Sequence, residues 1–166
     1  MSGYPLLLLF PAAMAFAGAM DLLTMTIPNR ISLALIGAFF TCAIVAGLTW
    51  EEIAVHLACG GIILLIVVGM FAANLLGGGD AKLMAASAIW VGYDNLMMYF
   101  LMISILGGVL ALALLAYRKL PAGAYSLPVW AERLHVPGGK MPYGVAIAAA
   151  ALWIYPKTIW FTTFGL

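Results

Sequence analysis

The chain has 166 residues, of which 66% are hydrophobic and 8% are charged. Soluble proteins carry a charge on about a quarter of their residues, and a soluble domain of this length could not bury so much apolar surface. The composition therefore excludes an ordinary soluble domain and predicts an integral membrane protein. The formal net charge of +1 gives no reason to expect a nucleic-acid partner.

Six apolar segments follow one another along the chain, and we predict an all-α fold with six transmembrane helices in a single domain, residues 1–166. A membrane-crossing helix needs about 20 apolar residues. The first segment lacks the basic stretch that opens a signal peptide, so we expect it to be a retained helix. The predicted spans are Tyr4–Met20, Ile31–Leu48, Ile53–Leu76, Ala81–Gly92, Leu96–Tyr117 and Tyr143–Phe161.

The connections between these spans predict the orientation of the protein. The fifth connection, Arg118–Pro142, is long and rich in proline and glycine, and we predict a short interfacial helix around Trp130. With both termini outside, every basic residue except Lys157 falls on the inner side, as the positive-inside rule requires. Asp21 and Asp80 then share the cytoplasmic face. The inner basic residues are Arg30, Lys82, Arg118, Lys119, Arg133 and Lys140.

The fourth span, Ala81–Gly92, is shorter than a membrane is thick. Its length as a helix is about 18 Å, against a hydrocarbon core of about 30 Å. Either the helix begins below the cytoplasmic surface, or it extends into the loop that follows it. In the first case Asp80 lies within the membrane boundary, where irregular backbone is tolerated only inside protein or beside a wet cavity. This arithmetic predicts a cavity near Asp80.

Asp21 and Asp80 are candidates for acid–base chemistry, because carboxyl groups in or near membrane helices are costly to keep there. Two carboxyl groups close together share a proton, so one can activate a water while the other protonates a carbonyl oxygen. The structural alternatives are a helix cap for Asp80 and an interfacial carboxylate for Asp21. His56 and His135 stand apart, and no HExxH motif is present. We therefore expect no metal and no cofactor.

Three motifs resemble a known family. Gly77-Gly78-Gly79-Asp80 fits the GxGD signature of intramembrane aspartyl proteases. The stretch DLLTMTIPNR, Asp21–Arg30, resembles the first-aspartate motif of the type IV prepilin peptidases. The stretch GGKMPYGVAIA, Gly138–Ala148, is similar to the segment before that family's last helix. The motifs occur in the family's order, and the resemblance covers essentially the whole chain.

The resemblance implies an aspartic endopeptidase of the bacterial inner membrane, with Asp21 and Asp80 as its catalytic dyad. Its implied substrate is a pilin or pseudopilin precursor, cut at the cytoplasmic face after a short basic leader. Its other implied partners are membrane lipid and other pilus assembly proteins. Larger family members have an N-terminal cytoplasmic domain with CxxC motifs and also N-methylate the product. Cys42 and Cys59 form no CxxC pair, so we expect no methyltransferase activity and a compact Cpa/Tad-type peptidase of the Flp pilus.

Residues close to the aspartates have expected supporting roles. Gly77–Gly79 suit a mobile loop that brings Asp80 to Asp21, or else a plain turn between helices. Lys82 would favour an ionised carboxylate or hold a substrate oxygen, or else anchor the helix at the membrane surface. Pro28 is expected to start a turn, and Asn29 to cap the following helix.

Pro142, Tyr143 and Gly144 open the last predicted helix and are candidate substrate contacts. Tyr143 would hydrogen-bond the dyad or the substrate, with a place in the interfacial aromatic belt as the alternative. We assign other aromatic residues to that belt, namely Trp50, Tyr93, Trp153 and Trp160.

A different class of function uses the same two aspartates. A small proton-coupled transporter or assembly subunit would employ Asp21 and Asp80 as a proton relay. Ion flux that depends on Asp80 would favour that class, whereas the absence of repeated halves in the sequence counts against it.

Overall fold

The computed structural model describes residues 4–120 and 128–164, and in these ranges every regular element is a helix. Apolar sequence of this kind forms helices in lipid because a helix satisfies its own backbone hydrogen bonds. The elements are α1 (Tyr4–Leu7), α2 (Leu9–Thr24), α3 (Asn29–Ala46), α4 (Trp50–Ala72), α5 (Gly78–Val91), α6 (Tyr93–Tyr117), α7 (Val129–His135), α8 (Tyr143–Ile154), the 3-10 turn η1 (Tyr155–Lys157) and α9 (Ile159–Thr163).

Four helical segments are long and apolar enough to cross a membrane: Pro5–Thr24, Asn29–Ala46, Trp50–Ala72 and Tyr93–Tyr117. They correspond to the first, second, third and fifth predicted spans. The fourth and sixth correspond to α5 and α8, which have 14 and 12 residues. At about 1.5 Å per residue, these two helices are about 21 and 18 Å long. The fold is therefore an all-helical, multi-pass membrane bundle that combines long and short helices.

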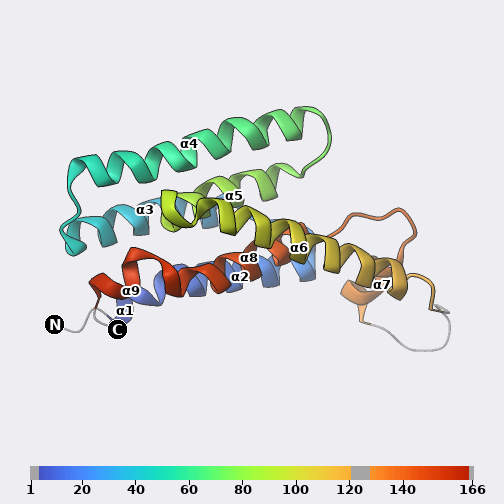
Figure 1. Ribbon diagram of the computed structural model, residues 1–166. Coiled ribbons are helices and arrows are strands. Elements are labelled where there is room, and N and C mark those ends of the chain that lie inside the picture. Colours follow the sequence, from blue (N-terminus) through green and yellow to red (C-terminus); the bar gives the residue numbers. More distant parts are fainter. Residues whose placement is uncertain (1–3, 121–127, 165–166) are drawn as a thin grey trace.

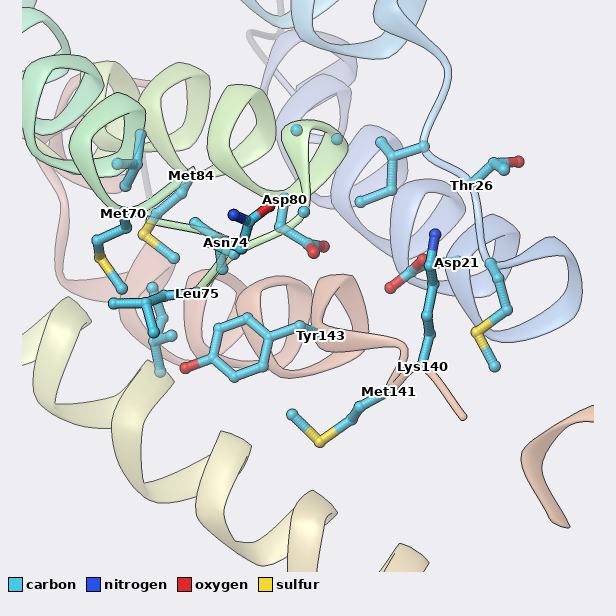
Figure 2. A pocket seen from close by; sticks show the side chains of 18 of the residues that line it. Asp21, Thr26, Met70, Asn74, Leu75, Asp80, Met84, Lys140, Met141 and Tyr143 are labelled. Carbon is cyan, nitrogen blue, oxygen red and sulfur yellow. The ribbon is translucent and has the colours of Figure 1, made fainter. Parts of the chain in front are cut away.

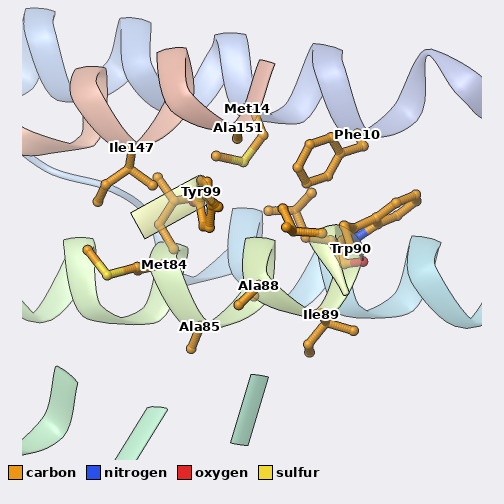
Figure 3. Packing of buried hydrophobic residues seen from close by; sticks show 14 of the residues in the cluster. Phe10, Met14, Met84, Ala85, Ala88, Ile89, Trp90, Tyr99, Ile147 and Ala151 are labelled. Atoms are coloured by element: carbon orange, nitrogen blue, oxygen red, sulfur yellow. Dashed lines mark hydrogen bonds between the residues drawn. The ribbon is translucent and has the colours of Figure 1, made fainter. Parts of the chain in front are cut away.

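Helix α5 lies at the centre of this bundle, with α3, α4, α6 and α8 packed around it, and α2 runs beside α8 (Figure 1). Ten of the 14 residues of α5 are buried, which explains why the helix is apolar on every side. Figure 3 shows its inner face meeting Phe10 and Met14 of α2 and Ile147 and Ala151 of α8. Elements α1 and α9 lie at one end of the bundle, and α7 lies at the other (Figure 1).

An aromatic cluster closes the end of the core near α9. The Trp160 indole N–H donates to the carbonyl oxygen of Trp90 over 2.8 Å, and the Trp90 indole N–H donates to the carbonyl oxygen of Leu35 over 2.9 Å. Trp160 is fully buried, so its assignment to the interfacial belt is wrong. Trp50, Tyr93 and Trp153 are 82%, 75% and 62% exposed, which is consistent with positions in the belt.

Small residues allow close approach between helices, as is usual in membranes. A Cβ on Gly60 of α4 would overlap Ile89 of α5, and a Cβ on Gly18 of α2 would lie 3.0 Å from the Cβ of Ala148 of α8. Gly107 of α6 lies under the ring of Tyr143. These three glycines therefore set the distances at which neighbouring helices pack.

Several helix boundaries differ from the predicted spans. Helix α2 includes Asp21 and continues to Thr24, and α5 and α6 are separated by Gly92 alone, which has a φ of 71°. The last predicted span breaks at Pro156, where a 3-10 turn separates α8 from α9, because proline lacks the N–H that a continuous helix needs. The short helix predicted around Trp130 is confirmed as α7, while its place at the membrane interface stays a prediction.

Candidate active site

Asp21 lies in the last turn of α2 and is 5% exposed. The helix ends just beyond it at Met25, whose backbone is left-handed and whose N–H donates to the Asp21 carbonyl oxygen over 2.8 Å. The Asp21 side chain accepts a hydrogen bond at Oδ2 from the backbone N–H of Gly144, over 2.7 Å. Residues far apart in the sequence therefore meet at this carboxyl group.

Asp80 is the third residue of α5 and is half-buried. The first turn of a helix favours a carboxylate, because its backbone N–H groups are free and its dipole end is positive. The Asp80 carboxyl group lies beside Gly77, the residue before the helix. The helix cap is Gly77, so the structural alternative, in which Asp80 itself caps the helix, is wrong.

Both aspartates line one cavity of about 1010 Å³. Figure 2 shows their carboxyl groups pointing toward the space between them, Asp80 from α5 and Asp21 from α2. The rest of the wall includes Met70 of α4 together with Phe100 and Ser104 of α6. Ser104 is close to the middle of α6, so the cavity reaches about halfway along a membrane-crossing helix. The cavity that the short fourth span predicts near Asp80 is confirmed.

The glycines before Asp80 do not form a three-residue loop, and that part of the prediction is wrong. Gly78 and Gly79 are the first residues of α5, and none of the three glycines has a positive φ. The structure gives them a different role, which is to leave space. A Cβ on Gly77 would lie 2.7 Å from Asp80 Oδ2, and one on Gly79 would lie 3.3 Å from the Cβ of Ile27. Movement of this segment stays a prediction.

Lys82 points away from the cavity. Its amino group donates to the side-chain oxygen of Asn29 over 3.0 Å on the exposed side of the helices. Asn29 is the first residue of α3 and does not cap it; the cap is Pro28, whose extended backbone lets its carbonyl oxygen accept from the N–H of Ile31. The Asn29 side chain is instead used to join α3 to α5. These three predicted site residues are next to the cavity but not in its wall.

The motif before the last long segment does reach the site. Helix α8 begins at Tyr143, as predicted, with Pro142 as its cap. Tyr143 lines the cavity, and its ring lies over Gly107 of α6; its hydrogen bond to the dyad or to the substrate stays a prediction. Gly144 supplies the N–H that binds Asp21. Both Pro142 and Gly144 are buried and lie outside the cavity wall.

A family model matches this chain over residues 8–112, which is more than half of its length, and its description is the type IV leader peptidase family. The chain belongs to the type IV leader peptidase family. The matched range holds both aspartates and most of the cavity wall, while α7 and α8 follow it. Searches of curated proteins and of solved structures gave no match.

Four polar side chains in the wall of this leader peptidase cavity were not predicted as site residues, namely Thr26, Asn74, Ser104 and Lys140. Lys140, just before α8, is the one basic residue among the described residues of the wall. Asn74 follows α4 with a φ of 58° and forms a Schellman turn with Leu75, whose N–H donates to the carbonyl oxygen of Met70 over 2.9 Å. The available signal for Asn74 is an asparagine near the end of an apolar segment, inside the predicted span Ile53–Leu76. Within the described ranges, no three His, Cys, Asp or Glu side chains are placed to hold a metal ion.

Proposed function

We propose that residues 1–166 form one membrane-embedded aspartic endopeptidase domain that removes the leader of pilin or pseudopilin precursors. Membership of the type IV leader peptidase family supports the substrate class. The observation that carries the aspartic mechanism is the cavity, because Asp21 and Asp80 enter it from two different helices. A cavity of this size also suits an extended peptide, since small-molecule pockets have volumes of about 300–1,000 Å³.

The two carboxyl groups would divide acid–base work between them. One accepts a proton from a water molecule as the water oxygen attacks the scissile carbonyl carbon, and the other gives a proton to the carbonyl oxygen. The tetrahedral intermediate then loses its C–N bond, and the departing amine takes a proton from the dyad. This scheme needs only the carboxyl groups of Asp21 and Asp80 and one water.

The distribution of charge supports a cytoplasmic site in the bacterial inner membrane. All the basic residues except Lys157 lie near the end of the bundle that holds the cavity, and Glu51, Glu52 and Asp94 lie near the other end. By the positive-inside rule the cavity end faces the cytoplasm. We propose that α5, and α8 together with α9, also cross the membrane, which gives six spans with both termini outside.

The cavity wall offers a route for the substrate. Its apolar part includes Ile66 and Met70 of α4 and Phe100 of α6 and matches the apolar helix of a pilin precursor. The segment to be cut would unwind beside the aspartates, and the basic leader would remain at the cytoplasmic surface. A compact Cpa/Tad-type enzyme of the Flp pilus without methyltransferase activity fits this chain, because Cys42 and Cys59 are each free and buried.

The test is a cleavage assay in membranes. A candidate precursor is co-expressed with the wild type, Asp21→Asn or Asp80→Asn, and removal of the leader is followed by the shift of the precursor on a gel. Asparagine keeps the size and polarity of aspartate but cannot exchange a proton. We expect cleavage by the wild type and none by either variant at equal expression.

Asp94→Asn is the matched control, because Asp94 lies in the first turn of α6, at the other end from the cavity. It should cleave like the wild type. Full cleavage by Asp21→Asn or by Asp80→Asn would remove that residue from the mechanism. Ion flux through reconstituted vesicles that is lost in Asp80→Asn, without any cleavage by the wild type, would replace the peptidase proposal with a proton relay.

A further inference from the structure

Asp21 occupies an unfavourable place for a negative charge. It lies in the last turn of α2, where unpaired carbonyl groups give the helix end a partial negative charge. It is also 5% exposed, so protein covers most of its surface. A carboxyl group in such a place needs a donor from the protein to hold it in one orientation.

The start of α8 provides that donor. Gly144 is the second residue of α8, and its backbone N–H has no partner within the helix, because the first four N–H groups of a helix are free. This N–H donates to Asp21 Oδ2 over 2.7 Å in a buried contact. The end of α2 is thus opposed by the positive end of α8. With Oδ2 bound to Gly144, Oδ1 of Asp21 is the oxygen left for water or a proton.

Residue 144 has no room for a side chain. A Cβ on Gly144 would lie 2.8 Å from Asp21 Oδ2, 3.1 Å from the Cβ of Asp21 and 2.7 Å from Cδ1 of Ile27. Real Cβ atoms do not approach other atoms this closely, so any side chain here would displace the carboxyl group or Ile27. Gly144 is not among the glycines with a positive φ. The requirement for glycine is therefore one of space and not of backbone torsion.

We propose that Gly144 is a positioning residue, whose backbone N–H and lack of a side chain together hold the Asp21 carboxyl group in the orientation used for hydrolysis. The catalytic part of this inference rests on the proposed peptidase function. The structural part, a coupling between residues 144 and 21, does not depend on it.

The first test compares cleavage kinetics of Gly144→Ala with those of Gly108→Ala. A Cβ on Gly108 of α6 meets no described atom within 4 Å, so this control should match the wild type. Misplacement of a reacting group by about 1 Å lowers rates by about 100-fold. We therefore expect Gly144→Ala to lower kcat by about 10- to 100-fold while KM changes by less than about twofold. Unchanged kcat, with Asp21→Asn inactive, would overturn the inference and leave the peptidase proposal standing.

A double variant separates Asp21 from the other neighbour of residue 144. Ile27→Val deletes the Cδ1 atom that the new methyl group would meet, but the contact with Asp21 remains. Gly144→Ala should lower kcat by the same factor in the Ile27→Val background as in the wild type. Recovery of kcat in the double variant would show that crowding of Ile27 causes the loss, and would overturn the inference.

The second test needs no activity. Gly144→Ala is made in the wild type and in Asp21→Ala, and thermal unfolding of the purified protein is measured in detergent. Removal of the carboxyl group makes room for the new methyl group, so the fall in Tm should be smaller in the Asp21→Ala background. Equal falls in Tm in both backgrounds would overturn the inference. This test remains valid even if the wild type cleaves no precursor and the proposed function fails.

Discussion

Gly60 and Gly61 of α4 are neighbours in the sequence but face different surroundings, which makes them a matched pair for testing helix packing around the site. A Cβ on Gly60 would overlap Cγ1 of Ile89 and lie 3.2 Å from the carbonyl oxygen of Ala85, both in α5. A Cβ on Gly61 meets nothing within 4 Å in the described part of the chain. The two alanine variants therefore differ in whether the new methyl group meets α5.

The free energies can be worked out from these contacts. Replacing a helical glycine by alanine gains about 1 kcal/mol of helix propensity at either position. Forcing one extra methyl group into a packed interface costs about 1–3 kcal/mol. The propensity gain cancels when the variants are compared, so Gly60→Ala should be about 1–3 kcal/mol less stable than Gly61→Ala.

The assay is reversible unfolding of the purified protein in mixed micelles with increasing denaturing detergent. Gly60→Ala should also cleave precursor more slowly, because α4 carries Ile66 and Met70 of the cavity wall. The destabilisation caused by Gly60→Ala should be smaller in an Ile89→Ala background, which lacks the clashing atom, than in the wild type. Equal stability of Gly60→Ala and Gly61→Ala, within about 0.5 kcal/mol, would refute the close packing of α4 on α5.

Two further pairs of variants test the site. Asp21→Asn should lose at least about 100-fold in cleavage rate yet unfold like the wild type, because its amide oxygen still accepts from Gly144. Asp21→Ala leaves that buried N–H unpaired and should be about 1–3 kcal/mol less stable in the same unfolding assay; equal stability of the two variants would argue against the hydrogen bond. Lys82→Met should keep the cleavage rate, since Lys82 binds Asn29 outside the cavity. Lys140→Met should lower it, and the reverse order of the two lysine variants would contradict the cavity wall described above.

The main features of the site follow from the sequence because they depend on the small number of acidic residues and on the length of one apolar segment. Asp21 and Asp80 are noticeable in a chain with six acidic residues, and the short apolar run after Asp80 requires a helix that begins below the surface. Both arguments use local information. They explain why the aspartates and the cavity were predicted together, and why the short last segment, with its break at Pro156, was predicted less well.

Contacts within the bundle could not be predicted in the same way. In a soluble helix, polar residues mark the outer face, but here lipid and protein neighbours are equally apolar. Nothing in the sequence distinguishes Trp160, which is fully buried, from Trp153, which is 62% exposed. The bond between Gly144 and Asp21 joins helices from opposite ends of the chain, so no local pattern reveals it.

The donor to Asp21 is a main-chain N–H, whereas the cavity wall is made of side chains. The orientation of the Asp21 carboxyl group and the choice of substrate can therefore change independently. No substitution except proline deletes a backbone N–H, so the support of Asp21 is insensitive to the choice of side chains around it, provided that residue 144 stays glycine. The wall of the cavity in which we propose that the peptide binds is made of side chains, such as those of Met70, Phe100 and Met141. Libraries randomised at these wall positions are therefore a route to altered cleavage specificity with the acid–base chemistry kept intact.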